Sequence, residues 1–170
     1  MRRLDCAALS RDLAVRELTA AESGAVFALY ETNPQYFRYC GSPALPETAA
    51  RDMASLPPGV DREQKYFLGY YDGGELLAVL DLIDGYPDAG TAFLGLFMVR
   101  GDRAGQGLGT RLMEELFASL ASAGFLRVRL AFAAENPQAA RFWAKNGFVV
   151  LRRVPHEYGE MSVAERPLTV

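Results

Sequence analysis

The segment from Thr91 to Leu120 constrains the fold of this chain more than any other. Its first part, Thr91–Val99, is an apolar run with the length and aromatic content of a buried strand. Three glycines at alternate positions follow, and leucines then recur at every fourth residue from Leu108 to Leu120. That spacing predicts one apolar face of a helix. The segment therefore predicts a strand, a glycine-rich turn and a helix in direct succession.

The glycine-rich turn, with Gly105, Gly107 and Gly109, favours the binding of an anion. Backbone without side chains lets several N–H groups approach one phosphate, and the positive end of a helix dipole favours that charge. The Walker loop requires a lysine after its last glycine, and the dinucleotide loop requires a third glycine where this chain has Thr110. The turn therefore predicts a phosphate site of another kind. The alternative is a tight turn that only packs a helix on a sheet.

A second helix, from Asn136 to Phe148, is marked at both ends. Asn136 is a favourable N-cap, Pro137 suits the first helical position, and Gly147 suits the residue after the helix. The run before this helix, Phe125–Phe132, alternates apolar and charged residues and predicts a strand. A second unit of strand and helix therefore follows the first.

The two units together resemble the GNAT superfamily of N-acetyltransferases, from about Phe67 to the C-terminus. The family's loop pattern, Arg/Gln-x-x-Gly-x-Gly/Ala, is matched at Gly107 and Gly109, and its later helix motif is matched at Asn136, Ala139, Phe142, Gly147 and Phe148. The resemblance implies acetyl-CoA as cofactor, with its pyrophosphate at the loop and its pantetheine arm along the later helix. It assigns cofactor binding to Phe97, Met98, Val99, Arg103, Ala104, Gly105, Gln106, Gly107, Leu108, Gly109, Thr110, Asn136 and Phe142.

The chain departs from the family pattern at three places. Ala104 stands where the family usually has Arg or Gln, although Arg103 beside it can supply a charge. Trp143 stands where many members have the tyrosine that protonates the departing thiolate, and an indole N–H is not a usable acid. Trp143 is therefore expected either to line the acetyl pocket or to be a core residue. The run Thr91–Val99 also lacks the glutamate that is frequent there in the family.

The resemblance implies direct attack of a primary amine on the acetyl thioester, and the amine, with a pKa of about 10, must first lose a proton. Asp81 is the first candidate for the base, because a carboxylate within an apolar strand is unusual and burial raises its pKa. The alternatives are a solvated carboxylate, one paired with an arginine, or a base supplied by water. The resemblance also implies that the backbone N–H of Met98 or a neighbour donates to the oxyanion. The catalytic candidates are Asp81, Met98 and Trp143.

The family builds its acceptor site from the first two helices, their connection and the last strands. Here the connection Asn33–Ser42 is rich in aromatic residues. A small cationic amine would be attracted by acidic residues expected nearby, namely Asp81, Asp84, Asp88 and Glu31. An open aromatic groove would suit a peptide N-terminus. The alternative for the aromatic residues is that they only pack the helices. Asp84, Tyr86 and the single histidine, His156, are weaker candidates for the base; the alternatives are an ordinary turn for Asp84 and Tyr86 and simple exposure for His156. The candidate substrate-binding residues are Tyr36, Phe37, Asp84 and Tyr86.

Length and charge favour one domain, residues 1–170, that does not bind nucleic acid: the chain has 170 residues, a net charge of −3 and a pI near 5.3. No apolar run approaches the ~20 residues that span a bilayer, and the N-terminal apolar stretch is short for a signal peptide. We expect a cytoplasmic monomer or homodimer. Cys6 and Cys40 lack metal-binding spacing, so no metal is expected.

The fold class expected is α/β (α+β): a GNAT-like mixed, mainly antiparallel central sheet of six to seven strands with helices on both faces. The alternative to an active enzyme is a catalytically silent acyl-CoA-binding regulatory module, and turnover separates the two. A longer acyl-CoA is a third possibility, with Gly95 opening space for it. The remaining elements expected are a strand at Leu13–Leu18, a helix opened by the capping box Thr19–Glu22, a short helix from Pro46, a hairpin within 66–83, and strands at Val149–Val154 and Glu157–Ala164.

Overall fold

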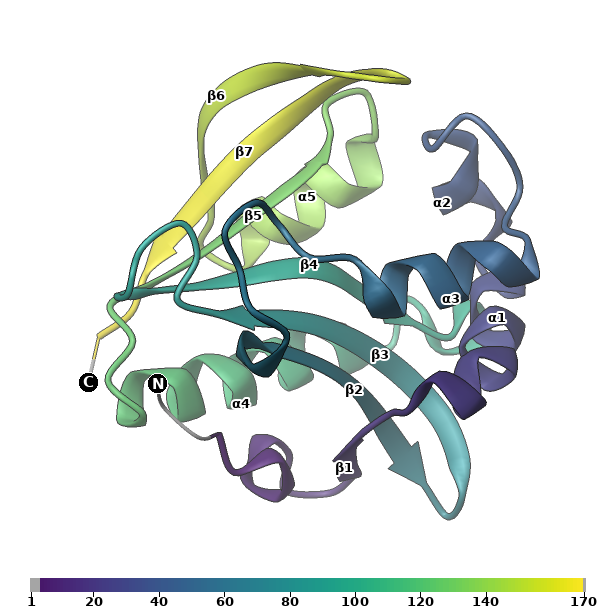
Figure 1. Cartoon of the computed structure of the whole chain (residues 1–170), viewed down its shortest axis with the longest axis horizontal. Helices are drawn as coiled ribbons and strands as arrows, with labels where there is room; N and C mark the ends of the chain where they lie inside the picture. Colours follow the sequence, from purple (N-terminus) through teal and green to yellow (C-terminus); the bar gives the residue numbers. More distant parts are fainter. Residues whose placement is uncertain (1–3, 170) are drawn as a thin grey trace.

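A computed structural model describes residues 4–169 of the chain. Seven strands form one sheet in the order β1-β2-β3-β4-β5-β7-β6, and among them β4 and β5 are the parallel neighbours (Figure 1). This mixed, mainly antiparallel sheet confirms the expected fold class. The strands are β1 Ala14–Glu17, β2 Lys65–Asp72, β3 Glu75–Asp84, β4 Thr91–Val99, β5 Arg127–Ala133, β6 Val149–His156 and β7 Gly159–Pro167.

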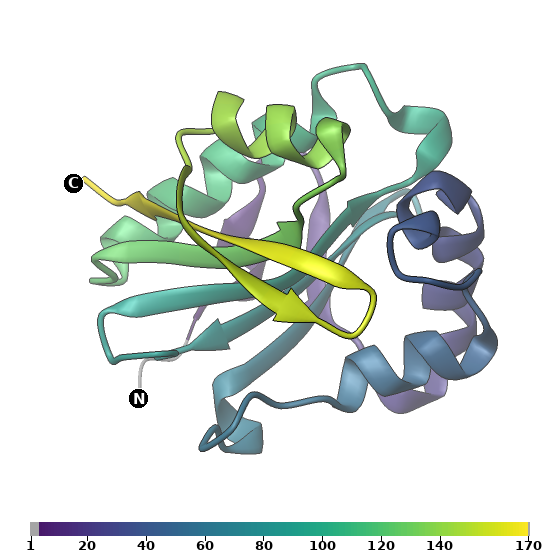
Figure 2. The same cartoon turned by 90° about the horizontal axis from the view of Figure 1, so that it is seen from above.

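Helices cover both faces of the sheet (Figures 1 and 2). The first three helices pack their apolar side chains on one face, and the last two pack on the other, so two separate clusters of core residues form. The α-helices are α1 Ser23–Glu31, α2 Pro34–Arg38, α3 Pro46–Ala54, α4 Leu108–Ser122 and α5 Pro137–Lys145, and the 3₁₀ turns are η1 Cys6–Leu9, η2 Ala20–Glu22, η3 Arg62–Gln64 and η4 Gly101–Arg103.

Three local expectations need correction. The helix α2 lies within the segment expected to be a connection, because five residues are too few to show a helical repeat. The capping box of Thr19 and Glu22 opens a helical segment as expected, but the first turn of this segment is the 3₁₀ turn η2, which runs directly into α1 at Ser23. Glu157 lies in the turn between β6 and β7 and not in the last strand, which begins at Gly159.

The hairpin of β2 and β3 contains an irregularity that decides which side chains share a face. Asp72 pairs with Glu75 across the two-glycine turn, but the register shifts by one between Tyr70 and Tyr71. Beyond this bulge Phe67 lies opposite Asp81. Since alternate residues of a strand point to the same face, Lys65 comes to the same face as Asp81, the face covered by α1–α3.

The sheet opens between β4 and β5. Their pairing extends from Thr91 opposite Arg127 to Leu94 opposite Leu130, and beyond it the two strands diverge (Figure 1). Gly95 follows the last paired residue and is itself a bulge against β3, because Asp81 pairs with Leu96 and the next residue of β3 pairs with Leu94. The opening therefore begins at Gly95.

Candidate active site

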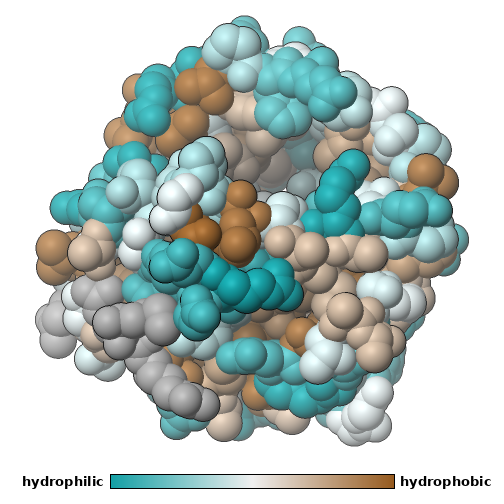
Figure 3. Space-filling view, in the orientation of Figure 1, coloured by the Kyte–Doolittle hydropathy of each residue, from teal (hydrophilic) through white to brown (hydrophobic). Residues whose placement is uncertain are grey.

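The carboxylate of Asp81 lies at the start of this opening. A Cβ atom added to Gly95 would overlap Oδ2 of Asp81 and would lie 2.9 Å from its Cγ. Only a glycine leaves room for the carboxylate there. The space at Gly95 is thus occupied by Asp81 and does not accommodate a longer acyl chain, which corrects that expectation. The surface is hollowed between the hairpin of β6 and β7 and α2 (Figure 3).

Asp81 belongs to a buried polar network. Its Oδ2 accepts a hydrogen bond of 3.1 Å from Nζ of Lys65, while its Oδ1 is buried and accepts none from the described residues. Nearby, Asp52 accepts a hydrogen bond of 2.8 Å from the hydroxyl of Tyr30. Burial raises the pKa of Asp81 to about 6, although Lys65 lowers it and Asp52 raises it further. Asp81 is therefore paired with a lysine and still has the pKa of a base that works near neutral pH.

The backbone of β4 offers N–H groups to the opening. The N–H of Arg100 donates to the carbonyl of Leu77 at the start of β3. In an antiparallel pair every second N–H of a strand points to the same neighbour, so this bond shows which N–H groups of β4 face β3. By that alternation the N–H of Met98 points to β3, whereas those of Phe97 and Val99 point toward the opening. The carbonyl of Val99 also points away from β3, because it accepts a hydrogen bond of 3.0 Å from Nδ2 of Asn33, which lies outside the sheet. Among the candidates, the neighbours of Met98 are therefore better placed than Met98 to donate to an oxyanion.

The glycine loop presents a row of unused donors. Gly105 and Gly107 have positive φ angles of 77° and 78°, and α4 begins directly after them. The backbone N–H groups of residues 105–110 donate to no acceptor within residues 4–169, and the first helical bond runs from Arg111 to Gly107. Arg103 forms no ion pair with a described carboxylate. Such a loop at a helix N-terminus is chemically suited to a phosphate or pyrophosphate.

Three elements meet beside this loop through aromatic rings. A Cβ atom on Gly109 would lie 3.1 Å from the ring of Phe142 and 3.7 Å from that of Phe97. Trp143 is buried, and its ring centroid lies 4.8 Å from that of Phe142 and 6.3 Å from that of Phe97. Asn136 caps α5, because its side chain accepts from the N–H of Ala139. The β4, α4 and α5 candidates for cofactor binding are thus brought together.

The candidate substrate residues fall into two separate places. Phe37 is buried among the helices, with its ring centroid 5.1 Å from that of Tyr30, whereas Tyr36 is partly exposed. Asp84 and Tyr86 lie at the other end of β3, where β4 is still paired with β5. The ring of Tyr86 packs against Phe93. Of the two candidates on α2, Tyr36 is therefore the one whose side chain is exposed enough to contact a substrate.

A second group of side chains near the opening joins the connection Asn33–Ser42 to the last strands, the segments from which the resemblance implied an acceptor site, although Glu135 and Glu160 were not singled out. Tyr39, Glu135, Tyr158 and Glu160 line a shallow cavity between α2, the end of β5 and the last hairpin, together with the exposed His156. The pairing of β5 with β7 brings these residues together, since Ala133 lies opposite Met161. No local pattern marks such a grouping, and only the order of the strands would have revealed it.

Two classes of site lack support in the described part of the chain. Within residues 4–169, no helix is both long and apolar enough to cross a membrane. The same residues contain no group of three or more histidine, cysteine, aspartate or glutamate side chains that could hold a metal ion.

Comparison with solved structures identifies proteins of the same fold. An acetyltransferase from Thermus thermophilus is 28% identical, with a TM-score of 0.75 over 93% of this chain and 98% of that chain. The ribosomal-protein-S18-alanine N-acetyltransferase from Escherichia coli is 18% identical, with a TM-score of 0.67 over 93% and 95%. The yncA protein from Salmonella typhimurium, solved with its cofactor acetyl-CoA, is 14% identical, with a TM-score of 0.64 over 94% and 96%.

Comparison of the sequence gives the family. No curated protein sequence matches the chain significantly. The model of the acetyltransferase (GNAT) family, however, matches residues 26–148, which include the glycine loop, α5 and the opening of the sheet. Because this match spans most of the chain and agrees with the fold, the chain belongs to the GNAT family of acetyltransferases, enzymes that use acetyl-CoA.

Proposed function

We propose that this chain transfers the acetyl group of acetyl-CoA to a primary amine of a small molecule or peptide, with Asp81 as the base. The observation that carries this proposal is the position of the Asp81 carboxylate. It lies at Gly95, where the sheet opens, and one of its oxygens is buried without a hydrogen-bond donor among the described residues. A buried, incompletely satisfied carboxylate in such a position is typical of a functional group.

The residues present fit acetyl-CoA. The unused N–H groups of residues 105–110 and the side chain of Arg103 would hold its pyrophosphate, and the open edge of β4 with Phe142 would hold its pantetheine arm. When bound, acetyl-CoA supplies an acetyl group activated as a thioester. The N–H groups of Phe97 and Val99, which point toward the opening, would stabilise negative charge on the oxygen of this acetyl group.

Removal of a proton from the acceptor amine is the main chemical step that the side chains must perform. An alkylammonium has a pKa of about 10 and is not nucleophilic until it loses a proton. The carboxylate of Asp81, which Lys65 holds at Gly95, would take that proton. A thiolate leaves more readily than an alkoxide because its pKa is about 8.5, so the tyrosine that Trp143 replaces is dispensable. Glu135 and Glu160, outside the opening, would favour a cationic acceptor.

Release of free thiol from acetyl-CoA, measured with a panel of small amines and short peptides, tests the proposal. We expect release that depends on the amine and a mass increase of one acetyl group on the acceptor. Binding of acetyl-CoA without release across the panel would instead identify a silent binding module. A chain that does not bind acetyl-CoA would contradict the assignment of the loop as well.

A glycine substitution tests the loop independently of catalysis. Gly107→Ala is expected to weaken acetyl-CoA binding about tenfold, because an alanine at positive φ costs about 1–2 kcal/mol and the loop must change shape to avoid this cost. Gly59→Ala is the matched control: its φ is 77° against 78° for Gly107, and at both positions a new Cβ meets nothing within 4 Å. Calorimetry should show wild-type affinity for the control. Equal affinity in both variants would exclude the loop as the phosphate site.

A further inference from the structure

Lys65 is a buried lysine whose donors are all in use. Its side chain is 3% exposed, and its ammonium donates to the backbone oxygens of Asp52 at 2.8 Å and Ser55 at 2.6 Å and to Oδ2 of Asp81 at 3.1 Å. An ammonium has three N–H groups, so none remains for a ligand. Any effect of Lys65 on a reaction must therefore pass through these three partners.

The hydrogen bond from Lys65 makes the two oxygens of the Asp81 carboxylate different. Oδ2 is held by the ammonium and lies against Gly95, whereas Oδ1 has no donor among the described residues. Rotation of the carboxylate would break the bond to Lys65 and move an oxygen away from the cation that holds it. Lys65 therefore fixes the orientation of the carboxylate, with Oδ2 against Gly95 and Oδ1 without a donor among the described residues.

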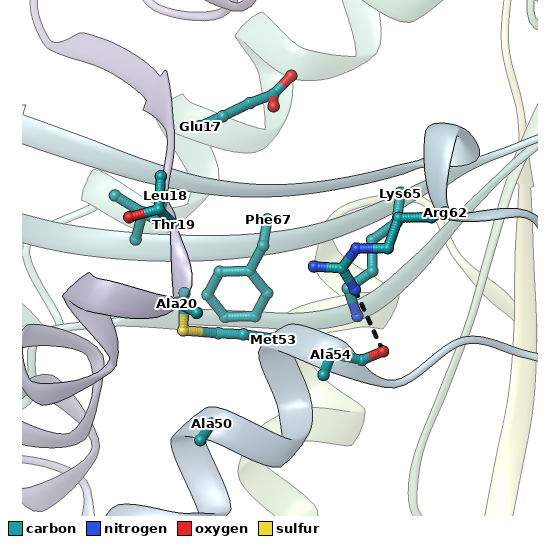
Figure 4. A pocket seen from close by; sticks show the side chains of 10 residues that line it. All are labelled: Glu17, Leu18, Thr19, Ala20, Ala50, Met53, Ala54, Arg62, Lys65 and Phe67. Carbon is teal, nitrogen blue, oxygen red and sulfur yellow. Dashed lines mark hydrogen bonds between the residues drawn. The ribbon is translucent and has the colours of Figure 1, made fainter.

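The other two partners of Lys65 lie at the C-terminal end of α3, where the carbonyls of a helix lack partners within the helix. Figure 4 shows Lys65 and Arg62 extending from the start of β2 and from η3 toward this end of the helix. Arg62 donates to the carbonyl of Ala54 at 3.4 Å. The ammonium of Lys65 thus joins α3, which covers this face of the sheet, to the carboxylate on β3.

We propose that Lys65 is a positioning residue: by binding Oδ2 of Asp81 and the end of α3 at one point, it holds the carboxylate against Gly95, at the start of the opening, where it acts as the proton acceptor. This inference rests on the proposed function. The charged or titratable groups facing Asp81 are Lys65 from β2 and Asp52 from α3, and Tyr30 from α1 binds Asp52. Of these, Lys65 is the cation, and it lowers the pKa of Asp81 against the effects of burial and of Asp52.

The first test is the pH dependence of kcat in Lys65→Met, which keeps the length of the side chain and removes its charge. Because the base is active when ionised, kcat should rise with pH through its pKa. Loss of a cation in contact should move this midpoint up by about 1–3 pH units. The variant should therefore lose activity at pH 7 and, because the carboxylate is no longer held in place, reach a lower plateau than wild type at high pH. Lys65→Arg should restore the midpoint most of the way. A loss by the same factor at every pH would indicate a merely structural role and overturn the proposal.

Arg62→Met is the matched control. Arg62 is a neighbouring cation that binds the same end of α3, but no bond joins it to Asp81 within residues 4–169. Its removal should leave the midpoint of the kcat profile unchanged. A shift as large as that of Lys65→Met would show that anchoring of α3 alone is responsible, which would also overturn the proposal.

A ¹³C NMR titration of the Asp81 carboxyl separates this inference from the proposed function, because it needs no substrate. The signal should titrate near the wild-type pKa of about 6 and at higher pH in Lys65→Met. If it does so in a protein without acetyltransferase activity, the proposed function fails while the link between Lys65 and Asp81 stands. An unchanged titration rejects the link. If Lys65→Met does not fold, the wild-type side-chain signals of Lys65 must shift together with the Asp81 carboxyl, and their independence rejects it equally.

Discussion

Replacing Asp81 with asparagine lowers kcat for amine acetylation by about 10²–10⁴-fold at neutral pH, the usual contribution of a general base. Asparagine keeps the shape of the side chain and an oxygen for Lys65, so the loss reports the missing proton acceptor. The wild-type rate should rise through a pH of about 6, because the base acts when ionised and burial raises the pKa of Asp81 to about 6. This limb of the profile should be absent from the variant. Thiol release from pH 5 to pH 9 measures both effects.

Asp52→Asn is the control for this substitution. Asp52 is also a carboxylate of the network, but it is partly exposed, and its side chain binds the hydroxyl of Tyr30 and not Lys65 or Asp81. Asparagine can still accept that hydrogen bond. The control should retain most of the rate, with its midpoint moved to lower pH, because Asp52 raises the pKa of Asp81. If Asp81→Asn kept the wild-type rate, the proton acceptor would be water and not Asp81.

Gly95→Ala should be nearly as damaging, although the change adds a single methyl group. The new Cβ would overlap Oδ2 of Asp81, so the carboxylate must leave its position between Gly95 and Lys65. A displacement of about 1 Å in a catalytic group can lower the rate by about 10²-fold. We therefore expect a fall in kcat of this size with acetyl-CoA binding retained, measured by thiol release and calorimetry.

The double variant Gly95→Ala with Asp81→Asn shows whether Gly95→Ala lowers kcat by displacing the carboxylate of Asp81. Two substitutions that affect one group are not additive, so the double variant should be about as slow as Asp81→Asn alone. Additive losses would mean that Gly95 acts on something other than Asp81. Gly24→Ala is the control for a glycine whose new Cβ meets nothing within 4 Å, and it should leave kcat unchanged.

Much of the second half of the chain was predictable because its patterns are local. The strand Thr91–Val99 has the expected bounds, and the glycine loop leads directly into α4. At α5, Asn136 is the N-cap and Gly147 follows the helix at positive φ, as their residue types predict. The assignments of individual residues to the cofactor stay predictions, since local pattern shows where a phosphate fits and not what binds.

The partner of Asp81 was not predictable, because it depends on one bulge. A regular hairpin closed by the turn at Gly73 and Gly74 would place Asp81 opposite Tyr66, with Lys65 on the other face. The register shift near Tyr70 moves every later pair by one residue and exchanges the faces. A bulge of this kind has no clear signal in an apolar strand. The sequence therefore suggested Asp81 as a base, but not its lysine.

The edge strand β6 has a consequence for how the protein behaves at high concentration. Its partner on one side is β7, so its other side presents unpaired backbone groups that can template a strand from another molecule. Arg152 and Arg153 oppose such growth by charge, and Pro155 removes an N–H from the ladder. The stretch Val149–Leu151 contains neither a charged residue nor a proline, and its three apolar side chains are 66%, 49% and 47% exposed. Aggregation of the folded chain would therefore begin at this stretch, and a lysine within it would make the protein more soluble.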